Sequence, residues 1–290
     1  MGRARLTGFV GLGAMGFPMA SRLAAAGCRL RVHDLDGAKV ARFRRRHACA
    51  DTGACEVVVA MLPDGRAVRR ALARSDMVAP GTLVVDMSSC APADTRRLAA
   101  LLARRGARLV DAPVSGRVDG ARTGTLSIMA GGSKADLRRA MPLLRKLGSR
   151  IFHAGPLGAG HVAKALNNYI AAAGTLAAFE ATAAGRALGL DPRVLVDIWN
   201  ASAGRNSTTE NKIRQHVLSG RYASGFSLAL YAKDVAIAAR LMPRAPLARA
   251  ANRIWRDAAR VLPRADHTRI YDYLEERACP PEPRRRRSRS

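Results

Sequence analysis

The sequence has no apolar run long enough to cross a membrane; residues 57–62 are typical of its short apolar stretches. A spanning helix needs roughly 20 consecutive apolar residues, so the pattern predicts no membrane segment. Residues 1–5 lead directly into a strand-like segment and leave no room for the apolar stretch of a signal peptide. We therefore expect a cytoplasmic protein.

Cysteine and histidine are sparse and lack the spacing of a metal centre. The five cysteines are odd in number and contain no CxxC pair, and the six histidines contain no HxxxH pair. Such spacing indicates neither a disulfide framework nor a zinc site. The sequence therefore predicts no metal.

Lysine is scarce, with 6 Lys against 43 Arg, although the net charge is +27. An excess of this size raises the question of nucleic acid binding. The charge is spread along the chain, which favours a solvated basic surface that attracts an anionic substrate and cofactor over a specific nucleic-acid partner. Residues 280–290 combine proline with consecutive arginines and are predicted to be a disordered basic tail.

Strand and helix signals alternate over residues 1–160. Apolar, β-rich runs occur at residues 6–10, 30–33, 57–61, 82–85, 108–110 and 126–129. Helical stretches such as residues 92–105 and 135–144 lie between most of them. This alternation predicts an α/β domain with a doubly wound, parallel sheet covered on both faces.

The strand signals stop after about residue 160. Residues 161–188 are rich in alanine, contain no proline and are followed by Gly189, which predicts one long helix. Asp191 and Pro192 then begin another helix as N-cap and first residue, and helical patterns continue over residues 228–242 and 247–261. We predict an all-α domain over residues 161–279, joined to the first by the long helix, with the active site in the cleft between them.

A GxGxxG motif follows the first strand and precedes the first helix, and its residues are Gly11, Leu12, Gly13, Ala14, Met15 and Gly16. In a Rossmann-type domain the first glycine permits the turn, the second admits a pyrophosphate, and the third lets helix and strand pack. Asp34 lies 18 residues beyond the motif, where an acidic residue binds the adenosine ribose. The motif predicts NAD; NADP stays open because Arg42 and residues 44–46 are close by.

Lys164 and Asn168 lie four residues apart near the start of the predicted long helix and therefore share one face. Their neighbours are mostly Ala, Val and Leu, so the lysine is expected to be partly desolvated, which lowers its pKa. Such a lysine can exchange a proton with a hydroxyl or carbonyl group, and the amide can orient the same oxygen. Spacing alone leaves a snorkelling lysine and a helix-capping asparagine as alternatives.

The chain resembles the β-hydroxyacid dehydrogenases, the family of 3-hydroxyisobutyrate dehydrogenase and tartronate semialdehyde reductase. Residues 8–20 resemble the cofactor signature of that family, and residues 160–168 resemble its catalytic motif, which implies a catalytic role for Lys164 and a substrate-anchoring role for Asn168. The resemblance assigns further positions to the cofactor (Met61, Leu62, Pro63, Ser89), to the substrate (Ser115, Gly116), and to both (Lys233).

The resemblance implies hydride transfer between NAD(P) and a small β-hydroxy acid or its semialdehyde, in a homodimer or homotetramer. Arg117 departs from the family pattern, which has glycine there, and this charge either crowds the substrate carboxylate or selects a particular acid. Two alternatives are an imine reductase, which usually lacks the lysine, and a non-catalytic, nucleic-acid-associated scaffold. Steeply salt-dependent DNA binding without turnover would identify the scaffold.

Overall fold

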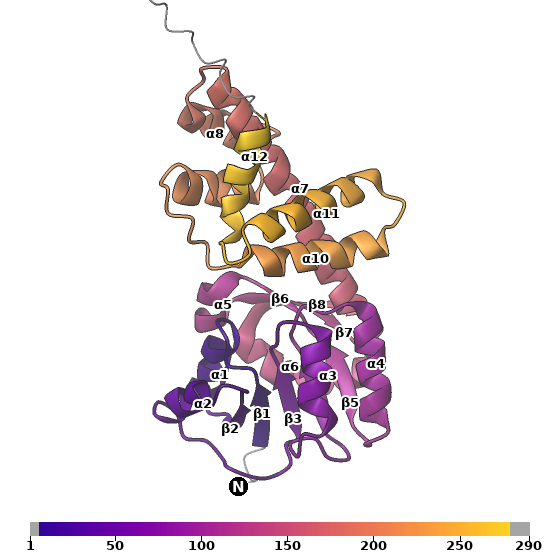
Figure 1. The fold of residues 1–290 in the computed structure, drawn as a ribbon. Coiled ribbons are helices and arrows are strands. Elements are labelled where there is room, and N and C mark those ends of the chain that lie inside the picture. The colour runs from indigo at the N-terminus through magenta and orange to yellow at the C-terminus, as the bar shows by residue number, and fades with distance from the viewer. Residues whose placement is uncertain (1–5, 279–290) are drawn as a thin grey trace, which may run out of the picture. The chain divides into compact units, whose positions relative to one another are not determined.

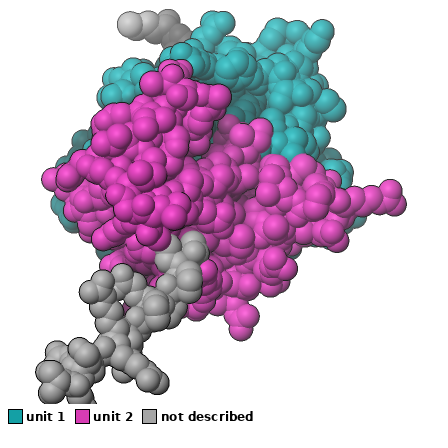
Figure 2. All heavy atoms as spheres, turned by 90° about the horizontal axis from the view of Figure 1, so that it is seen from above, with its two compact units in different colours: residues 1–166 teal, residues 167–290 magenta. Residues whose placement is uncertain are grey.

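The computed structural model describes residues 6–278, so the predicted basic tail lies outside the described residues. The chain divides into two compact units, Met1–Leu166 and Asn167–Ser290, shown in teal and magenta in Figure 2. The division falls inside the long helix α7 (Ala159–Ala187), which occupies the region of the predicted long helix. Over the described residues, no helix combines the length and the apolar character that crossing a bilayer requires.

Unit 1 is built on an eight-stranded sheet in the order β2-β1-β3-β4-β5-β7-β6, with β8 paired to β7 (Figure 1). The first five strands are parallel, as predicted, so their carboxyl ends meet at one edge. The strands are β1 (Leu6–Val10), β2 (Arg29–His33), β3 (Val57–Ala60), β4 (Leu83–Asp86), β5 (Arg108–Asp111), β6 (Val114–Ser115), β7 (Leu126–Gly131) and β8 (Gly148–Gly155).

The prediction of an all-parallel sheet is wrong beyond β5, because β7 runs antiparallel to β5 and β6 runs antiparallel to β7. The connection from β5 contains the short strand β6 and the helix α5 (Arg117–Thr123). Because β6 is parallel to β5 in direction and pairs antiparallel with β7, the chain reverses its direction across α5, between β6 and β7.

Helices cover both faces of the parallel strands, which confirms the doubly wound prediction. Neighbouring residues of β3 point to opposite faces: Val59 packs in a core cluster with Phe43, and Val58 in another with Leu72. The first cluster involves α1 (Gly16–Ala25), α2 (Gly37–Arg44) and α6 (Lys134–Leu147), and the second involves α3 (Gly65–Ala73) and α4 (Pro92–Ala103).

Unit 2 is helical and has its own core, in which Phe179, Tyr231 and Trp255 are buried. The Asp191 side chain accepts a hydrogen bond from the Arg193 backbone N–H, which confirms the predicted N-cap. The further elements are α8 (Pro192–Asn200), α9 (Ser207–Asn211), a π-helical turn (Ile213–Val217), α10 (Leu228–Leu241), α11 (Pro246–Val261), a 3-10 turn (His267–Arg269) and α12 (Ile270–Ala278).

His267 is expected to make the stability of unit 2 depend on pH. Burial, followed by the nearby charge of Lys212, lowers the pKa of His267 from 6.5 to about 4. The unfolded chain therefore binds the proton more tightly than the folded one, so the contribution is fully present above pH 6.5 and is lost as the pH falls toward 4. We expect a loss of about 3 kcal/mol across this window.

Urea denaturation followed by tryptophan fluorescence measures this effect, because both tryptophans, Trp199 and Trp255, belong to unit 2. The variant His267→Asn keeps a polar group near the position of Nδ1 and cannot titrate, so its stability should change less between pH 7 and pH 4.5. An equal pH dependence in both proteins would assign the effect to other groups.

Candidate active site

The three glycines of the loop between β1 and α1 have different surroundings. Gly11 has a φ of +99°, and a Cβ atom there would collide with the Met61 carbonyl oxygen. A Cβ at Gly16 would collide with the Gly11 carbonyl oxygen, whereas one at Gly13 would meet nothing within 4 Å. The first and third glycines close the turn, and the second leaves the backbone of the loop open to a ligand.

The Asp34 carboxylate connects the end of β2 to this loop. It accepts hydrogen bonds from the backbone N–H of Leu12, at 2.7 Å, and of Asp36, at 2.9 Å. A carboxylate offers about four lone-pair sites. Asp34 therefore supports the loop and still has acceptor capacity for the ribose hydroxyls that the sequence assigned to it.

A cavity of about 740 Å³ lies beside the loop within unit 1 and is lined in part by Leu12, Gly13 and Ala14. Its lining includes five cationic side chains: Arg22, Lys39, Arg42, Arg46 and Arg122. Exposed loop backbone at a helix N-terminus, together with clustered cations, suits a diphosphate. The residues present therefore fit a dinucleotide cofactor.

The cofactor segment, residues 61–63, is hydrogen-bonded to the end of β1 and to the loop after β4. The Met61 backbone N–H donates to the Val10 carbonyl at 2.9 Å. The Leu62 backbone N–H donates to Ser88 Oγ at 3.0 Å. Pro63 follows Leu62, and Ser89 lies half-buried directly after Ser88. The structure thus brings the segments with Leu12, Leu62 and Ser89 together at the carboxyl ends of β1, β3 and β4.

Ser115 ends β6, and the next two residues have unusual backbone conformations. Gly116 has a φ of +135° and Arg117 a φ of +60°, the left-handed region that disfavours residues with a Cβ atom. Arg117 is exposed, and its guanidinium makes no hydrogen bond or ion pair with another residue in the described range 6–278. The loop therefore keeps a glycine-like turn while it adds a positive charge.

The start of α7 is fixed in unit 1 by Asp111, the last residue of β5. Its two carboxylate oxygens accept from the backbone N–H groups of Gly158, at 2.7 Å, and His161, at 2.8 Å. A carboxylate at this end of a helix satisfies free N–H groups and complements the helix dipole. Lys164 lies half-buried three residues after His161. The sequence-predicted lysine is therefore carried by a helix whose first turn is held to the sheet.

In unit 2, Asp234 connects the two residues that the sequence assigned to the substrate. Asn168 Nδ2 donates to Asp234 Oδ2 at 2.7 Å, and Lys233 Nζ lies 3.0 Å from Asp234 Oδ1. The Asp234 side chain is only 3% exposed. Asn168 on α7 and Lys233 on α10 are thus held together by one buried carboxylate.

No role was predicted for Asp111, His161 or Asp234, although each lies within four residues of a predicted site residue. The available signal was position: Asp111 follows a buried strand, and Asp234 is next to Lys233. Polar residues at such points need partners when they are buried. Their partners lie at least 47 residues away in sequence, so spacing alone does not identify them.

The doubly wound sheet, the glycine loop and the basic cavity define a domain suited to a dinucleotide cofactor. Residues 7–155 match the model of the NAD binding domain of 6-phosphogluconate dehydrogenase. Residues 158–274 match the model described as NAD-binding of NADP-dependent 3-hydroxyisobutyrate dehydrogenase.

Two relatives and one solved structure among those that resemble this chain are also dehydrogenases. An NAD-dependent L-serine dehydrogenase of Pseudomonas aeruginosa is 39% identical over 79% of this chain and 83% of its own. A 2-(hydroxymethyl)glutarate dehydrogenase of Eubacterium barkeri is 36% identical over 80% of each chain. The structure of Mycobacterium tuberculosis 3-hydroxyisobutyrate dehydrogenase with L-serine has a TM-score of 0.85 and 31% identity, over 93% of this chain and 99% of that one.

The chain belongs to the 3-hydroxyisobutyrate dehydrogenase family. It is an NAD(P)-dependent oxidoreductase of small hydroxy acids that acts on a CH–OH group. These relatives give no support to the alternative of a nucleic-acid-associated scaffold.

Proposed function

We propose that Lys164 is the acid/base of this dehydrogenase and that the substrate is a short β-hydroxy acid or its semialdehyde. The observation that carries the proposal is the placement of a half-buried lysine on the anchored start of α7, in the same unit as the glycine loop. A lysine can accept a proton from a hydroxyl and return it to a carbonyl oxygen.

The substrate carboxylate binds at Ser115, Gly116 and the amide groups that follow. Gly116 leaves that backbone accessible because it has no side chain, and the Ser115 hydroxyl can donate a hydrogen bond. Asn168 orients the reacting oxygen, and Lys233 adds positive charge for the substrate or the cofactor. Asp234 aligns both of these side chains through the contacts described above.

The bound nicotinamide supplies the hydride acceptor or donor. During oxidation, Lys164 Nζ takes the proton of the substrate hydroxyl, and during reduction it gives a proton to the carbonyl oxygen, which becomes the hydroxyl. The protein contributes orientation and electrostatic stabilisation of the reacting oxygen. Asp34 favours NAD over NADP, because its carboxylate repels a phosphate on the ribose.

A substrate panel tests this proposal. The purified protein is assayed by nicotinamide absorbance with NAD or NADP and with L-serine, 3-hydroxyisobutyrate, 2-(hydroxymethyl)glutarate and short semialdehydes. We expect turnover with at least one β-hydroxy acid and a preference for NAD. Binding of NAD without turnover of any member of the panel would contradict the proposed substrate class.

Arg117 is expected to favour an acid with a second carboxylate. Its guanidinium is available to a ligand, and one relative is named for 2-(hydroxymethyl)glutarate, a dicarboxylic acid. In Arg117→Gly we expect the KM for the dicarboxylate to rise about tenfold, as for a lost charge-assisted hydrogen bond, with a smaller change for L-serine. Glycine also suits the left-handed backbone, so stability should not fall.

Steady-state kinetics with both acids measure this selectivity, and Arg138→Ala on α6 is the control for the loss of an exposed arginine. Arg138 does not line the cavity beside the glycine loop and is expected to leave the ratio of the two KM values unchanged. Equal effects of Arg117→Gly on both acids would contradict a role in selecting the second carboxylate.

We further propose a cytoplasmic homodimer or homotetramer. In unit 2, the α7 face with Ala177, Ala181 and Ala184 is exposed and lines an open groove with Ile254 and Leu274. Small residues allow a second helix to approach closely. Light scattering tests this proposal, and a monomer at assay concentration would overturn it.

A further inference from the structure

We propose that His161 is a positioning residue that sets the place of Lys164 by tying the start of α7 to the loop after β4. The inference rests on the proposed role of Lys164. It concerns residues of unit 1 only, and His161 itself is 1% exposed.

The imidazole of His161 is held at both nitrogens by different elements. Nε2 lies 3.0 Å from the Ser88 carbonyl oxygen, and Nδ1 lies 2.7 Å from Thr95 Oγ1. A carbonyl oxygen only accepts, so Nε2 carries the proton, and in the neutral ring Nδ1 accepts from the Thr95 hydroxyl. The ring therefore joins α7 both to the loop after β4 and to α4.

The backbone of the same helical turn is also fixed. Asp111 accepts from the N–H groups of Gly158 and His161, and a Cβ at Gly160 would collide with the Met129 carbonyl oxygen. The helix therefore begins in direct contact with β7, where only glycine fits. These contacts fix how closely the first turn of α7 approaches the sheet. The hydrogen bonds of the His161 ring fix the rotation of that turn about the helix axis.

A continuous set of contacts then runs from the cofactor segment to the lysine. The Leu62 N–H donates to Ser88 Oγ, the Ser88 carbonyl accepts from His161, and Lys164 lies three residues further along the helix. Residues three apart on a helix lie on the same side, one above the other. Because a misplacement of about 1 Å can cost 100-fold in rate, a ring that couples these groups matters for catalysis.

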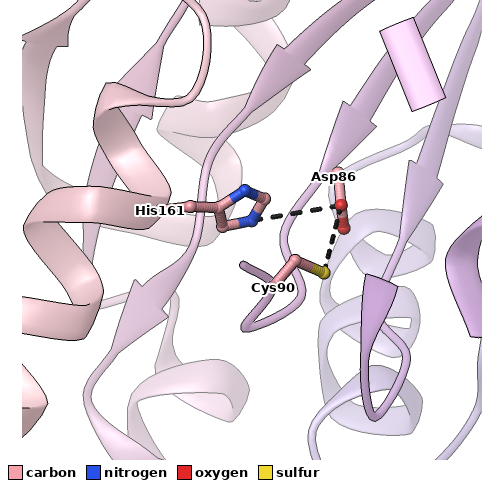
Figure 3. A group of neighbouring side chains, drawn as sticks. All are labelled: Asp86, Cys90 and His161. Carbon is pink, nitrogen blue, oxygen red and sulfur yellow. Dashed lines mark hydrogen bonds and ion pairs between the residues drawn. The ribbon is translucent and has the colours of Figure 1, made fainter. Parts of the chain in front are cut away.

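The same histidine belongs to a buried group with Asp86 and Cys90, whose potential ligand atoms lie within 4.8 Å of one another (Figure 3). Asp86 Oδ2 lies 3.9 Å from His161 Nε2 and accepts from Cys90 Sγ at 3.5 Å. The Nε2 proton already points to the Ser88 carbonyl, so the ring presents no lone pair toward Asp86. We therefore interpret Asp86 and Cys90 as side chains that support the His161 ring, and not as ligands of a metal ion.

Two substitutions of His161 separate positioning from folding. His161→Gln can place an amide N–H near the position of Nε2 and keep the bond to Ser88, whereas His161→Asn reaches only the position of Nδ1. We expect His161→Asn to lower kcat about 10- to 100-fold, with the Kd for NAD changed less than about twofold. His161→Gln is expected to recover most of the rate. Urea denaturation reports the stability of each variant.

Thr95→Val is the second variant and applies if His161→Asn does not fold. It keeps the shape of Thr95 and removes the hydroxyl, and Thr95→Ser restores the hydroxyl. We expect a severalfold lower kcat in Thr95→Val at unchanged NAD affinity, and recovery in Thr95→Ser. Unchanged kcat in folded His161→Asn or Thr95→Val would overturn the inference, as would equal losses of kcat in His161→Asn and His161→Gln.

Lys164→Ala in the same series distinguishes the two proposals. If Lys164→Ala keeps turnover, the proposed function of the lysine fails, whatever the His161 variants do. If Lys164→Ala loses turnover and His161→Asn keeps it, only the positioning role fails.

Discussion

Replacement of Lys164 by alanine is expected to lower kcat by about 100- to 10,000-fold, which is the usual contribution of a positioned general acid or base. The reason is that no other amine carries the proton to and from the reacting oxygen in the proposed mechanism. The Kd for NAD should change little, because Lys164 is not among the residues that line the cavity beside the glycine loop. Steady-state kinetics and a cofactor titration measure both quantities.

Lys164→Arg makes this test sharper, because arginine keeps the positive charge but does not give up its proton in proteins. If the lysine only attracts the substrate, arginine should restore activity; we expect that it does not. Lys134→Ala is the matched control, since Lys134 is an exposed residue in the first turn of α6 and matches no motif. Full activity of Lys164→Ala would remove the lysine from the mechanism.

The glycine loop provides the second large effect. Gly16→Ala should destabilise unit 1 by about 1 to 3 kcal/mol, because its Cβ atom would collide with the Gly11 carbonyl and force the backbone to move. Gly13→Val should leave the fold intact, because a Cβ at Gly13 meets nothing within 4 Å. It should raise the Kd for NAD at least about tenfold, because the new side chain occupies the open approach to the loop.

Far-UV circular dichroism during urea denaturation measures the stability of both glycine variants, and calorimetry measures NAD binding. The two variants are controls for each other, since one is expected to affect folding and the other binding. Wild-type NAD affinity in Gly13→Val would show that the pyrophosphate does not lie against this loop.

Much of this architecture could be predicted from the sequence, because local patterns specify it. The β-rich run at residues 6–10 is the strand β1 without change, and Asp191 with Pro192 marks the start of a helix correctly. The pattern did not reveal that β7 is antiparallel to β5, because strand direction is set by pairing between distant segments and not by the strand's own residues. The short strand β6 and the strand β8, whose residues are largely exposed, also lacked a clear signal.

The candidate site shows the same division between local and long-range information. Gly11 and Asp34 were predicted as cofactor residues from the spacing of a motif, and Lys164 was predicted as the catalytic residue from the resemblance of residues 160–168 to a family motif. Asp234 and His161 form hydrogen bonds with partners 66 and 73 residues away, and such pairs become visible only in three dimensions. The left-handed backbone at Arg117 was equally hidden, because an arginine gives no sign that it occupies a glycine-like position.

The most direct test of hydride transfer follows the hydrogen atom itself. A β-hydroxy acid that the enzyme turns over is prepared with deuterium on the carbon that bears the hydroxyl, and it is incubated with the enzyme and NAD. We expect the deuterium to appear on the nicotinamide ring of the reduced cofactor, as detected by mass spectrometry. If product forms while the reduced cofactor carries no deuterium, or while the deuterium is released to water, hydride transfer from the hydroxy acid is contradicted.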